Sequence, residues 1–303
     1  MSLILHHYDA SPFTQRALRM LGLKRLPWRS VVTPMMPPKD DLVALTGGYR
    51  GTPVLQIGAH VFIDSQRIAL ELERRHPQPT LFPDGNAGLS LALVKWSDAF
   101  FRTGLHMAIA LMSPSWPQEF LADRRGLFSD IDFRRVAADL EHSRSQLRAH
   151  ASFLNSLLAD GRRFLTGEAP GMADIQAFGT PWFTRAGMPV VSELLADLEH
   201  LPAWEARVAA LGEGQRTEID ARTAFAEARN APRDFQEGID ARDAQGLEAG
   251  MAVRVAPDDT QRGAVEGRVV IARANEIAVR RTHPAVGEVL VHFPRLGYRV
   301  TRL

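Results

Sequence analysis

The stretch that decides the fold lies at residues 49–65 and reads Tyr49-Arg50-Gly51-Thr52-Pro53-Val54-Leu55-Gln56-Ile57-Gly58-Ala59-His60-Val61-Phe62-Ile63-Asp64-Ser65. Its two short apolar runs, 54–57 and 60–63, are separated by a Gly-Ala turn, and this pattern predicts a β-hairpin. Proline is tolerated in a sheet at an edge, at the first position or at a bulge, so Pro53 should open the first strand. A cis Thr52–Pro53 bond would suit a tight turn here. It would turn the backbone N–H and C=O groups of Thr52 and Val54 toward an extended ligand.

The same stretch ends in Asp64 and Ser65, after which the apolar residues adopt helical spacing at Ile68 and Leu72. The first turn of a helix has backbone N–H groups without intrahelical partners. Together with a carboxylate and a hydroxyl, these N–H groups form a place that attracts charged groups of a ligand. A plain helix start is the alternative interpretation of this pair.

The segment before the hairpin predicts a strand, a helix and a second strand. Residues 3–8 form a short apolar run, and residues 28–32 are expected to form the second strand. Between them, Ser11 is a suitable N-cap and Pro12 suits the first position of a helix. A right-handed crossover makes the two strands parallel. A βαβ unit followed by a ββα unit is the thioredoxin arrangement, and we therefore assign residues 1–80 to a thioredoxin-like domain.

The rest of the chain changes character twice. Helical periodicity dominates residues 87–212, which predicts an all-helical domain with helices over 87–112, 132–160, 172–186, 191–198 and 203–211. Residues 213–246 are rich in Ala, Glu, Arg and Asp, which predicts a helical linker. Residues 247–303 contain short β-prone runs between turn residues, which predicts a small antiparallel β domain, SH3-like or barrel-like. The expected fold class is α+β with several domains.

Composition narrows the possible functions. At 303 residues, with 45% hydrophobic and 23% charged residues, the chain resembles ordinary soluble globular proteins. A net charge of +1 does not favour nucleic acid or a membrane as partner, and the lack of cysteine excludes disulfides and cysteine nucleophiles. His6 and His7 point to opposite faces of one strand, so we expect no metal site. With no signal peptide and no long apolar run, we expect a cytoplasmic protein.

Together these features resemble the glutathione S-transferase superfamily. The resemblance rests on Tyr8…Ser11-Pro12-Phe13, Thr52-Pro53-Val54-Leu55, Asp64-Ser65, and Phe164-Leu165-Thr166-Gly167 with Met172-Ala173-Asp174-Ile175. The Ser-Pro-Phe pattern is nearest to the tau and omega classes, and the resemblance covers residues 1 to about 212. It implies a bacterial transferase-like protein with an extra C-terminal region, glutathione as co-substrate, no metal, and a homodimer.

The sequence departs from the family pattern in two of these motifs. Before the Thr-Pro turn many members carry a basic residue, and here that residue is Gly51. Arg50 or Lys39 would then have to meet the glycine carboxylate of glutathione. Gly171 stands where the family has a serine or threonine N-cap, so half of the capping box with Asp174 is missing.

The resemblance also implies a role for each N-terminal motif. Ser11 would donate a hydrogen bond to the glutathione thiolate, with Tyr8 as the alternative donor and a plain helix cap as the other interpretation of Ser11. Asp64, one methylene shorter than the glutamate usual there, would hold the γ-glutamyl group together with Ser65. The backbone on either side of Pro53 would hold the cysteinyl part. The full set of expected glutathione-binding residues is Phe13, Lys39, Arg50, Thr52, Pro53, Val54, Asp64 and Ser65.

The expected second substrate is a small hydrophobic electrophile. Trp96, Phe100 and Met107 on the first long helix are candidates for its pocket, with a role in the helical core as the alternative. We therefore expect an enzyme that activates the glutathione thiol for attack on this electrophile. The first alternative is a non-catalytic scaffold with the same fold, whose C-terminal β domain binds a partner. Glutathione-dependent isomerisation or dehalogenation is the second.

Overall fold

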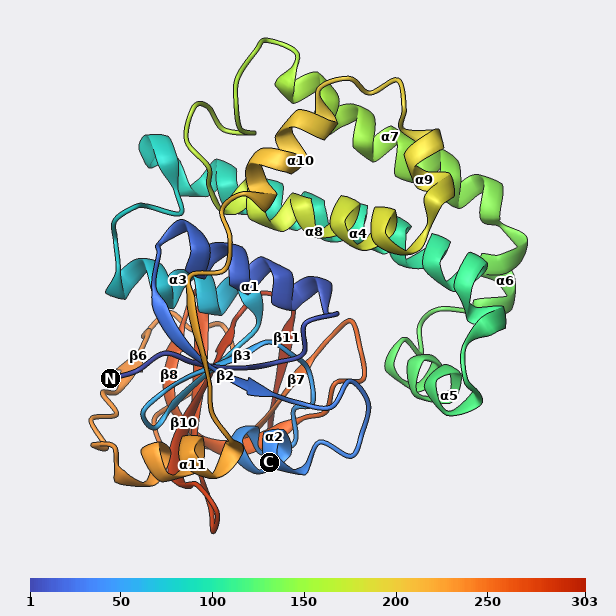
Figure 1. Cartoon of the computed structure of the whole chain (residues 1–303). Helices are drawn as coiled ribbons and strands as arrows, with labels where there is room; N and C mark the ends of the chain where they lie inside the picture. The colour runs from blue at the N-terminus through green and yellow to red at the C-terminus, as the bar shows by residue number, and fades with distance from the viewer. The chain divides into compact units, whose positions relative to one another are not determined.

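The computed structural model describes the backbone of residues 1–303 and every side chain except that of Asp84. It forms two compact units (Figure 1). The first unit contains Met1–Thr14, Pro27–Glu71 and Gln215–Leu303, and the second contains Gln15–Leu26 and Leu72–Gly214. The sequence-based domain boundaries remain a prediction, because compactness does not show which segments fold independently.

The N-terminal part of the first unit has the thioredoxin arrangement that the sequence predicts. The elements of this N-terminal region are β1 (Ile4–His7), α1 (Pro12–Leu23), β2 (Pro27–Val32), α2 (Asp40–Thr46), β3 (Val54–Ile57), β4 (His60–Ile63) and α3 (Ser65–Arg75). Helices α1 and α3 begin in the first unit, and most of α1 and the last residues of α3 belong to the second. Strand β1 pairs with β2 in parallel and with β3 in antiparallel orientation, and β3 pairs with β4. The expected βαβ and ββα units are confirmed.

The C-terminal part of the first unit contains the antiparallel strands that the sequence predicts. The elements here are β5 (Gln215–Glu218), α11 (Ala221–Asn230), β6 (Gly238–Ile239), β7 (Ala252–Pro257), β8 (Val265–Arg273), β9 (Glu276–His283), β10 (Gly287–Pro294) and β11 (Tyr298–Arg302). The strands run in the order β11-β7-β8-β9-β10-β4-β3-β1-β2-β5, and β6 pairs with β8. They therefore continue the thioredoxin-like sheet, where the sequence suggests a β domain of its own.

Two pairings join the C-terminal region to the thioredoxin-like part. Strand β10 pairs with β4 in parallel, and β5 pairs with β2 in parallel. The segment expected to be a helical linker thus contains helix α11 but also contributes β5, and its Phe225 and Ala228 are buried. Composition alone underestimates this segment because its few apolar side chains are concentrated on one face of α11.

One hydrophobic core supports both parts of this sheet. Helices α2 and α11 lie on the same side of it (Figure 1), and Leu42 and Phe225 share a buried cluster with Val61 of β4 and Val291 of β10. Burial of apolar surface contributes about 25 cal/mol per Å². The β4–β10 junction is therefore stabilised by packing as well as by the ladder of backbone hydrogen bonds.

A chain of polar side chains also crosses the β4–β10 junction. His60 Nδ1 lies 2.9 Å from His292 Nε2, and His292 Nδ1 lies 2.8 Å from Glu276 Oε1. Arg67 of α3 stands 3.6 Å from Glu276 Oε2. Buried polar groups need such partners, so this row of hydrogen-bonded side chains makes the register of β10 against β4 specific.

The second unit is helical from residue 87 onward, as expected. Its helices are α4 (Ala87–Met112), α5 (Gln118–Leu127), α6 (Phe133–Ala138), α7 (Leu140–Leu158), α8 (Met172–Gly187), α9 (Pro189–Leu194) and α10 (Leu201–Ala209), with 3₁₀ turns at Pro83–Gly85 and Ser113–Ser115. The single helix expected over 132–160 is wrong: it is interrupted at Asp139, whose φ of −94° and ψ of 27° end α6. None of the helices described is long and apolar enough to cross a membrane.

Asp174 organises the start of α8. Its Oδ1 accepts hydrogen bonds from the Leu165 N–H and from Trp204 Nε1, both at 2.8 Å, and its Oδ2 accepts from the Gly171 N–H at 3.0 Å. A Cβ atom on Gly171 would lie 2.6 Å from Pro83 Cδ. Pro83 thus occupies the space that a side chain at the N-cap position would need. The Asp174 carboxylate is the side chain that accepts the hydrogen bond from the N-cap N–H.

Candidate functional site

The predicted glutathione-binding residues all belong to the first unit and lie on its N-terminal elements. Ser11 stands at the start of α1, where its buried Oγ accepts a hydrogen bond from the Thr14 N–H at 3.2 Å. The helix-cap interpretation of Ser11 is thus satisfied. A hydroxyl that accepts one hydrogen bond keeps its own proton to donate, so capping and thiolate binding are compatible.

The alternative thiol activator, Tyr8, is half-buried beside Lys39. The Lys39 ammonium lies 5.2 Å from the centre of the Tyr8 ring, within cation–π distance. Lys39 itself is buried and immediately precedes α2. Tyr8 therefore contacts a predicted binding residue, whereas Ser11 lies at the N-terminus of a helix.

The turn before β3 has the geometry that the sequence predicts. The Thr52–Pro53 peptide bond is cis, Pro53 and Val54 are buried, and Thr52 is partly exposed. A Cβ atom on Gly51 would lie 2.4 Å from the Tyr49 hydroxyl oxygen. A basic residue at position 51 would therefore require the buried Tyr49 ring to move.

Asp64 and Ser65 form the start of α3. Asp64 has a φ of +78°, and its Oδ1 accepts a hydrogen bond from the Gln66 N–H at 2.9 Å. Its Oδ2 accepts a hydrogen bond from the Tyr298 hydroxyl at 3.3 Å. Ser65 is 7% exposed. The left-handed conformation places Asp64 outside the helix. Its carboxylate there accepts hydrogen bonds both from the first turn of α3 and from Tyr298 of β11.

Sequence reasoning missed the part that the C-terminal region has in this site. The Arg50 N–H donates to the Arg262 carbonyl at 2.8 Å, and Arg50 Nε donates to the Gln261 carbonyl at 3.3 Å. A Cβ atom on Gly48 would lie 2.4 Å from the Ala264 carbonyl oxygen, so the two backbones touch here. The β7–β8 loop is therefore docked on the loop that leads into the cis-proline turn.

Arg262 and Tyr298 are the C-terminal residues that enter the site. Arg262 Cζ lies 5.2 Å from the centre of the Phe13 ring, and Tyr49 makes side-chain hydrogen bonds with Arg262 and Tyr298. Burial raises the pKa of Tyr49 and the pKa of Tyr298 above the ordinary tyrosine value. Both phenols therefore stay protonated at neutral pH. No sequence signal identifies Arg262, because it stands in a turn-forming stretch far along the chain.

The residues predicted to line the electrophile pocket lie on α4 in the second unit. Phe100 is 2% exposed and Met107 is fully buried, and both belong to the helical core. Trp96 is half-buried, with its ring 5.7 Å from that of Phe100. This burial favours the core interpretation for Phe100 and Met107, and the pocket remains a prediction.

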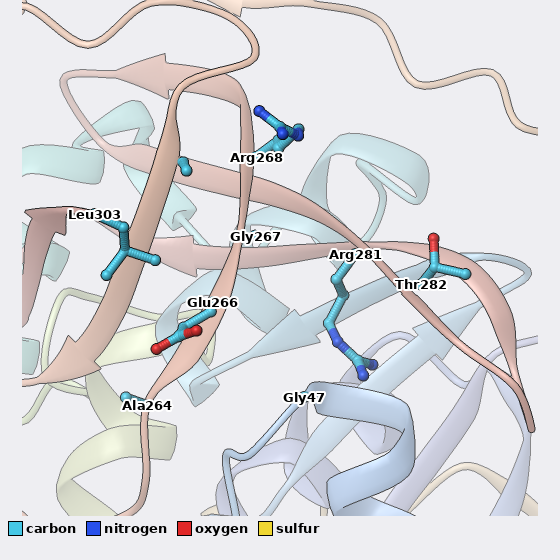
Figure 2. Close-up of a pocket in the computed structure, with 9 residues that line it drawn as sticks. Gly47, Ala264, Glu266, Gly267, Arg268, Arg281, Thr282 and Leu303 are labelled. Atoms are coloured by element: carbon cyan, nitrogen blue, oxygen red, sulfur yellow. The ribbon is translucent and has the colours of Figure 1, made fainter.

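A hollow of about 650 Å³ lies over the C-terminal strands (Figure 2). Arg281 of β9 points from it toward Gly47, and its Nη1 donates to the carbonyls of Ala44 and Leu45 at 2.8 and 3.2 Å. These bonds cap the C-terminal end of α2. None of the predicted glutathione-binding residues lines this hollow, so it is separate from the candidate site.

Among the side chains that the structure describes, no group of three or more His, Asp or Glu residues is placed to hold a metal ion. His6 and His7 have other partners: His6 Nε2 lies 2.9 Å from Gln56 Oε1, and His7 Nε2 lies 3.0 Å from Ser30 Oγ. Burial lowers the pKa of each to about 4. These neutral imidazoles belong to the interior of the sheet.

Comparison with known proteins identifies the family. The family model "Glutathione S-transferase, N-terminal domain" matches residues 5–80, and "Glutathione S-transferase, C-terminal domain" matches residues 137–207. A GST-like protein from Pseudomonas syringae is 34% identical, with a TM-score of 0.81, over 100% of this chain and 99% of that protein. The similarity therefore includes the C-terminal strands.

More distant structures share the fold over part of the chain. A glutathione transferase from Phanerochaete chrysosporium is 18% identical, with a TM-score of 0.57, over 70% of this chain and 97% of that protein. A glutathione S-transferase from Rhodospirillum rubrum is 22% identical, with a TM-score of 0.51, over 77% of this chain and 94% of that protein. The search of curated proteins gave no match.

Proposed function

The chain belongs to the glutathione S-transferase superfamily, and from this premise we propose that it binds glutathione and activates its thiol for attack on a small hydrophobic electrophile. The observation that carries the proposal is local. Ser11 at the start of α1, the cis Thr52–Pro53 turn and the Asp64–Ser65 start of α3 are all elements of the first unit. These elements offer a hydroxyl, an extended backbone and a charged helix start to one ligand.

Thiol activation is the chemical requirement. A free thiol has a pKa of about 8.5, so it is mostly protonated at neutral pH. Lowering this pKa by one unit requires about 1.4 kcal/mol of preferential stabilisation of the thiolate. The N-terminus of α1 favours negative charge, and the Ser11 hydroxyl supplies a hydrogen-bond donor there. Each can contribute about 1 kcal/mol, which together suffices to bring the thiol pKa near 7.

The remaining residues bind the tripeptide and the electrophile. The proposal gives the cysteinyl part to the backbone of Thr52 and Val54, and the γ-glutamyl part to Asp64 and Ser65. Trp96 is the remaining α4 candidate for contact with the electrophile, because Phe100 and Met107 belong to the helical core. We further propose that the protein is cytoplasmic and forms a homodimer. Light scattering after gel filtration would test the dimer.

Calorimetric titration of glutathione tests the binding site. We expect binding by the wild type in the micromolar to millimolar range, and binding weakened about tenfold in Ser65→Ala, the effect of one hydrogen bond. Ser145→Ala, on the exposed face of α7, is the matched control and should bind like the wild type. No heat of binding with the wild type would refute the proposal.

The pH dependence of turnover tests the role of Ser11. In Ser11→Ala, the pH at which the rate with a model electrophile is half-maximal should rise by about one unit, because one donor to the thiolate is lost. Loss of the cap also costs about 1 kcal/mol of stability. A thermal melt therefore accompanies the assay. A lower rate with an unchanged pH profile would assign Ser11 to capping alone.

One observation favours the scaffold alternative. The Asp64 carboxylate already accepts a hydrogen bond from Tyr298, and Arg50 is hydrogen-bonded to the β7–β8 loop. Two predicted binding residues are thus engaged by the chain's own C-terminal region. Glutathione binding without turnover on any electrophile class, including isomerisation and dehalogenation substrates, would favour this alternative.

A further inference from the structure

The C-terminal region brings a permanent cation to the candidate glutathione site. Arg262 belongs to the β7–β8 loop, outside both segments matched by the family models. Its guanidinium nevertheless lies against Phe13, two residues after Ser11, and hydrogen-bonds to Tyr49 beside the cis-proline turn. An arginine side chain stays charged at every physiological pH. A cation from a distant segment therefore stands among the predicted binding residues.

The backbone of this loop is held in place on both sides of the side chain. The Arg262 carbonyl accepts from the Arg50 N–H at 2.8 Å. Next to it, Gly263 has a φ of +91°, and a Cβ atom there would lie 2.1 Å from the Gly48 carbonyl oxygen. Only glycine permits this approach. The position of Arg262 is thus fixed before a ligand arrives, which lowers the entropy lost on binding.

The surroundings of Arg262 pair it with an anion. Tyr298 hydrogen-bonds to Tyr49, which in turn contacts Arg262, and the Tyr298 hydroxyl donates to Asp64 Oδ2 at 3.3 Å. Two carboxylates act on the Arg262 guanidinium with their negative charge, first Asp259 of the same loop and then Asp64. The site thus contains a carboxylate and a guanidinium joined through two phenols. Such a pair is complementary to a ligand group that carries an ammonium and a carboxylate on one carbon atom.

We propose that Arg262 is a ligand-binding residue of the glutathione site and receives the α-carboxylate of the γ-glutamyl residue. The inference rests on the proposed function and deepens it. Asp64 would receive the α-ammonium of the same residue. Guanidinium binds carboxylate with two parallel hydrogen bonds, which a lysine cannot reproduce. The cation at the site then comes from the β7–β8 loop, while Gly51 leaves room for the Tyr49 ring that holds it.

Three peptides separate this role from a purely structural one. Glutathione carries both carboxylates, γ-glutamylcysteine lacks the glycine carboxylate, and 4-aminobutyryl-cysteinylglycine lacks the α-carboxylate but keeps the ammonium. Calorimetric affinities of each would be measured for the wild type, Arg262→Gln, Arg262→Lys and the control Arg299→Gln. Arg299 is an exposed arginine on β11, next to Tyr298.

The proposal predicts a specific pattern of losses. Arg262→Gln should weaken glutathione and γ-glutamylcysteine by about 10- to 100-fold, the effect of losing a charge-assisted hydrogen bond, and change 4-aminobutyryl-cysteinylglycine less than about twofold. Arg262→Lys should give a smaller loss with the same ligand dependence. Arg299→Gln should bind all three peptides like the wild type.

Other patterns overturn the proposal. An equal loss for all three peptides would make Arg262 a structural residue, and a loss confined to the two glycine-containing peptides would assign it to the other carboxylate. If Arg262→Gln does not fold by circular dichroism, the same comparison applies to Arg262→Lys. Absence of glutathione binding by the wild type would instead refute the proposed function itself.

Discussion

Replacement of Asp174 by alanine should destabilise the protein more than any surface change. The carboxylate is fully buried and accepts three hydrogen bonds, from the Leu165 and Gly171 N–H groups and from Trp204 Nε1. Asp174→Ala leaves three buried donors without a partner, each at about 1–3 kcal/mol. Burial also raises the pKa of Asp174, so removing the carboxylate relieves a desolvation cost. We therefore expect a net loss of about 3–5 kcal/mol in the free energy of unfolding.

Urea denaturation followed by tryptophan fluorescence measures this loss, because Trp204 itself donates to Asp174. Asp174→Asn should lose less, since its amide oxygen still accepts from two donors while its NH₂ group faces the Gly171 N–H. Asp197→Ala is the matched control. It removes an exposed carboxylate that pairs with Arg148 at 2.5 Å, and its urea midpoint should stay close to that of the wild type.

A loss below about 1.5 kcal/mol in Asp174→Ala would refute the reasoning. It would mean that water or a shifted backbone group satisfies the three donors. Equal losses in Asp174→Ala and Asp174→Asn would also contradict it, because the two variants differ in the number of donors left without an acceptor.

Three further predictions follow from other parts of the molecule. Because burial lowers the pKa of His6 and His7 to about 4, the unfolded chain binds protons more readily than the folded one as the pH falls below 6.5. The free energy of unfolding should therefore be lower at pH 5 than at pH 7.5 by about 2 kcal/mol per histidine, and coinciding urea titrations at the two pH values would contradict this. Arg281→Ala should raise hydrogen exchange of the α2 amides about tenfold, whereas exposed Arg280→Ala should leave it unchanged; equal exchange in both would contradict the capping role. Gly171→Ser should lower stability by about 1–3 kcal/mol despite supplying a better N-cap residue, because its Cβ meets Pro83, and a raised melting temperature would count against this explanation.

Local patterns in the sequence predicted the thioredoxin-like part. The Gly-Ala turn between two apolar runs indicated the hairpin, and Pro53 at the start of a strand indicated the cis bond that the structure contains. The helix over 87–112 was also predicted with its observed bounds. These features depend on residues close together in the chain, where propensity and periodicity are informative.

Contacts between distant residues could not be predicted in this way. The pairing of Leu290 with His60 and the docking of Arg262 against Arg50 join segments separated by more than half of the chain. The departure at Gly51 is likewise explained only by the position of the Tyr49 ring. A single sequence indicates which segments form strands. Which strand pairs with which depends on side chains from distant segments that pack against both.

The parallel pairing of β10 with β4 makes the C-terminal region a cover for an otherwise open sheet edge. Without β10, the backbone N–H and C=O groups along the outer side of His60–Ile63 would be unpaired, next to apolar side chains. Such an edge is a template for pairing with another chain. A protein shortened to about residue 245 would therefore self-associate through β4. A chain trimmed to the two segments that resemble known transferases would expose this edge, so fusion partners and affinity tags belong on the intact polypeptide.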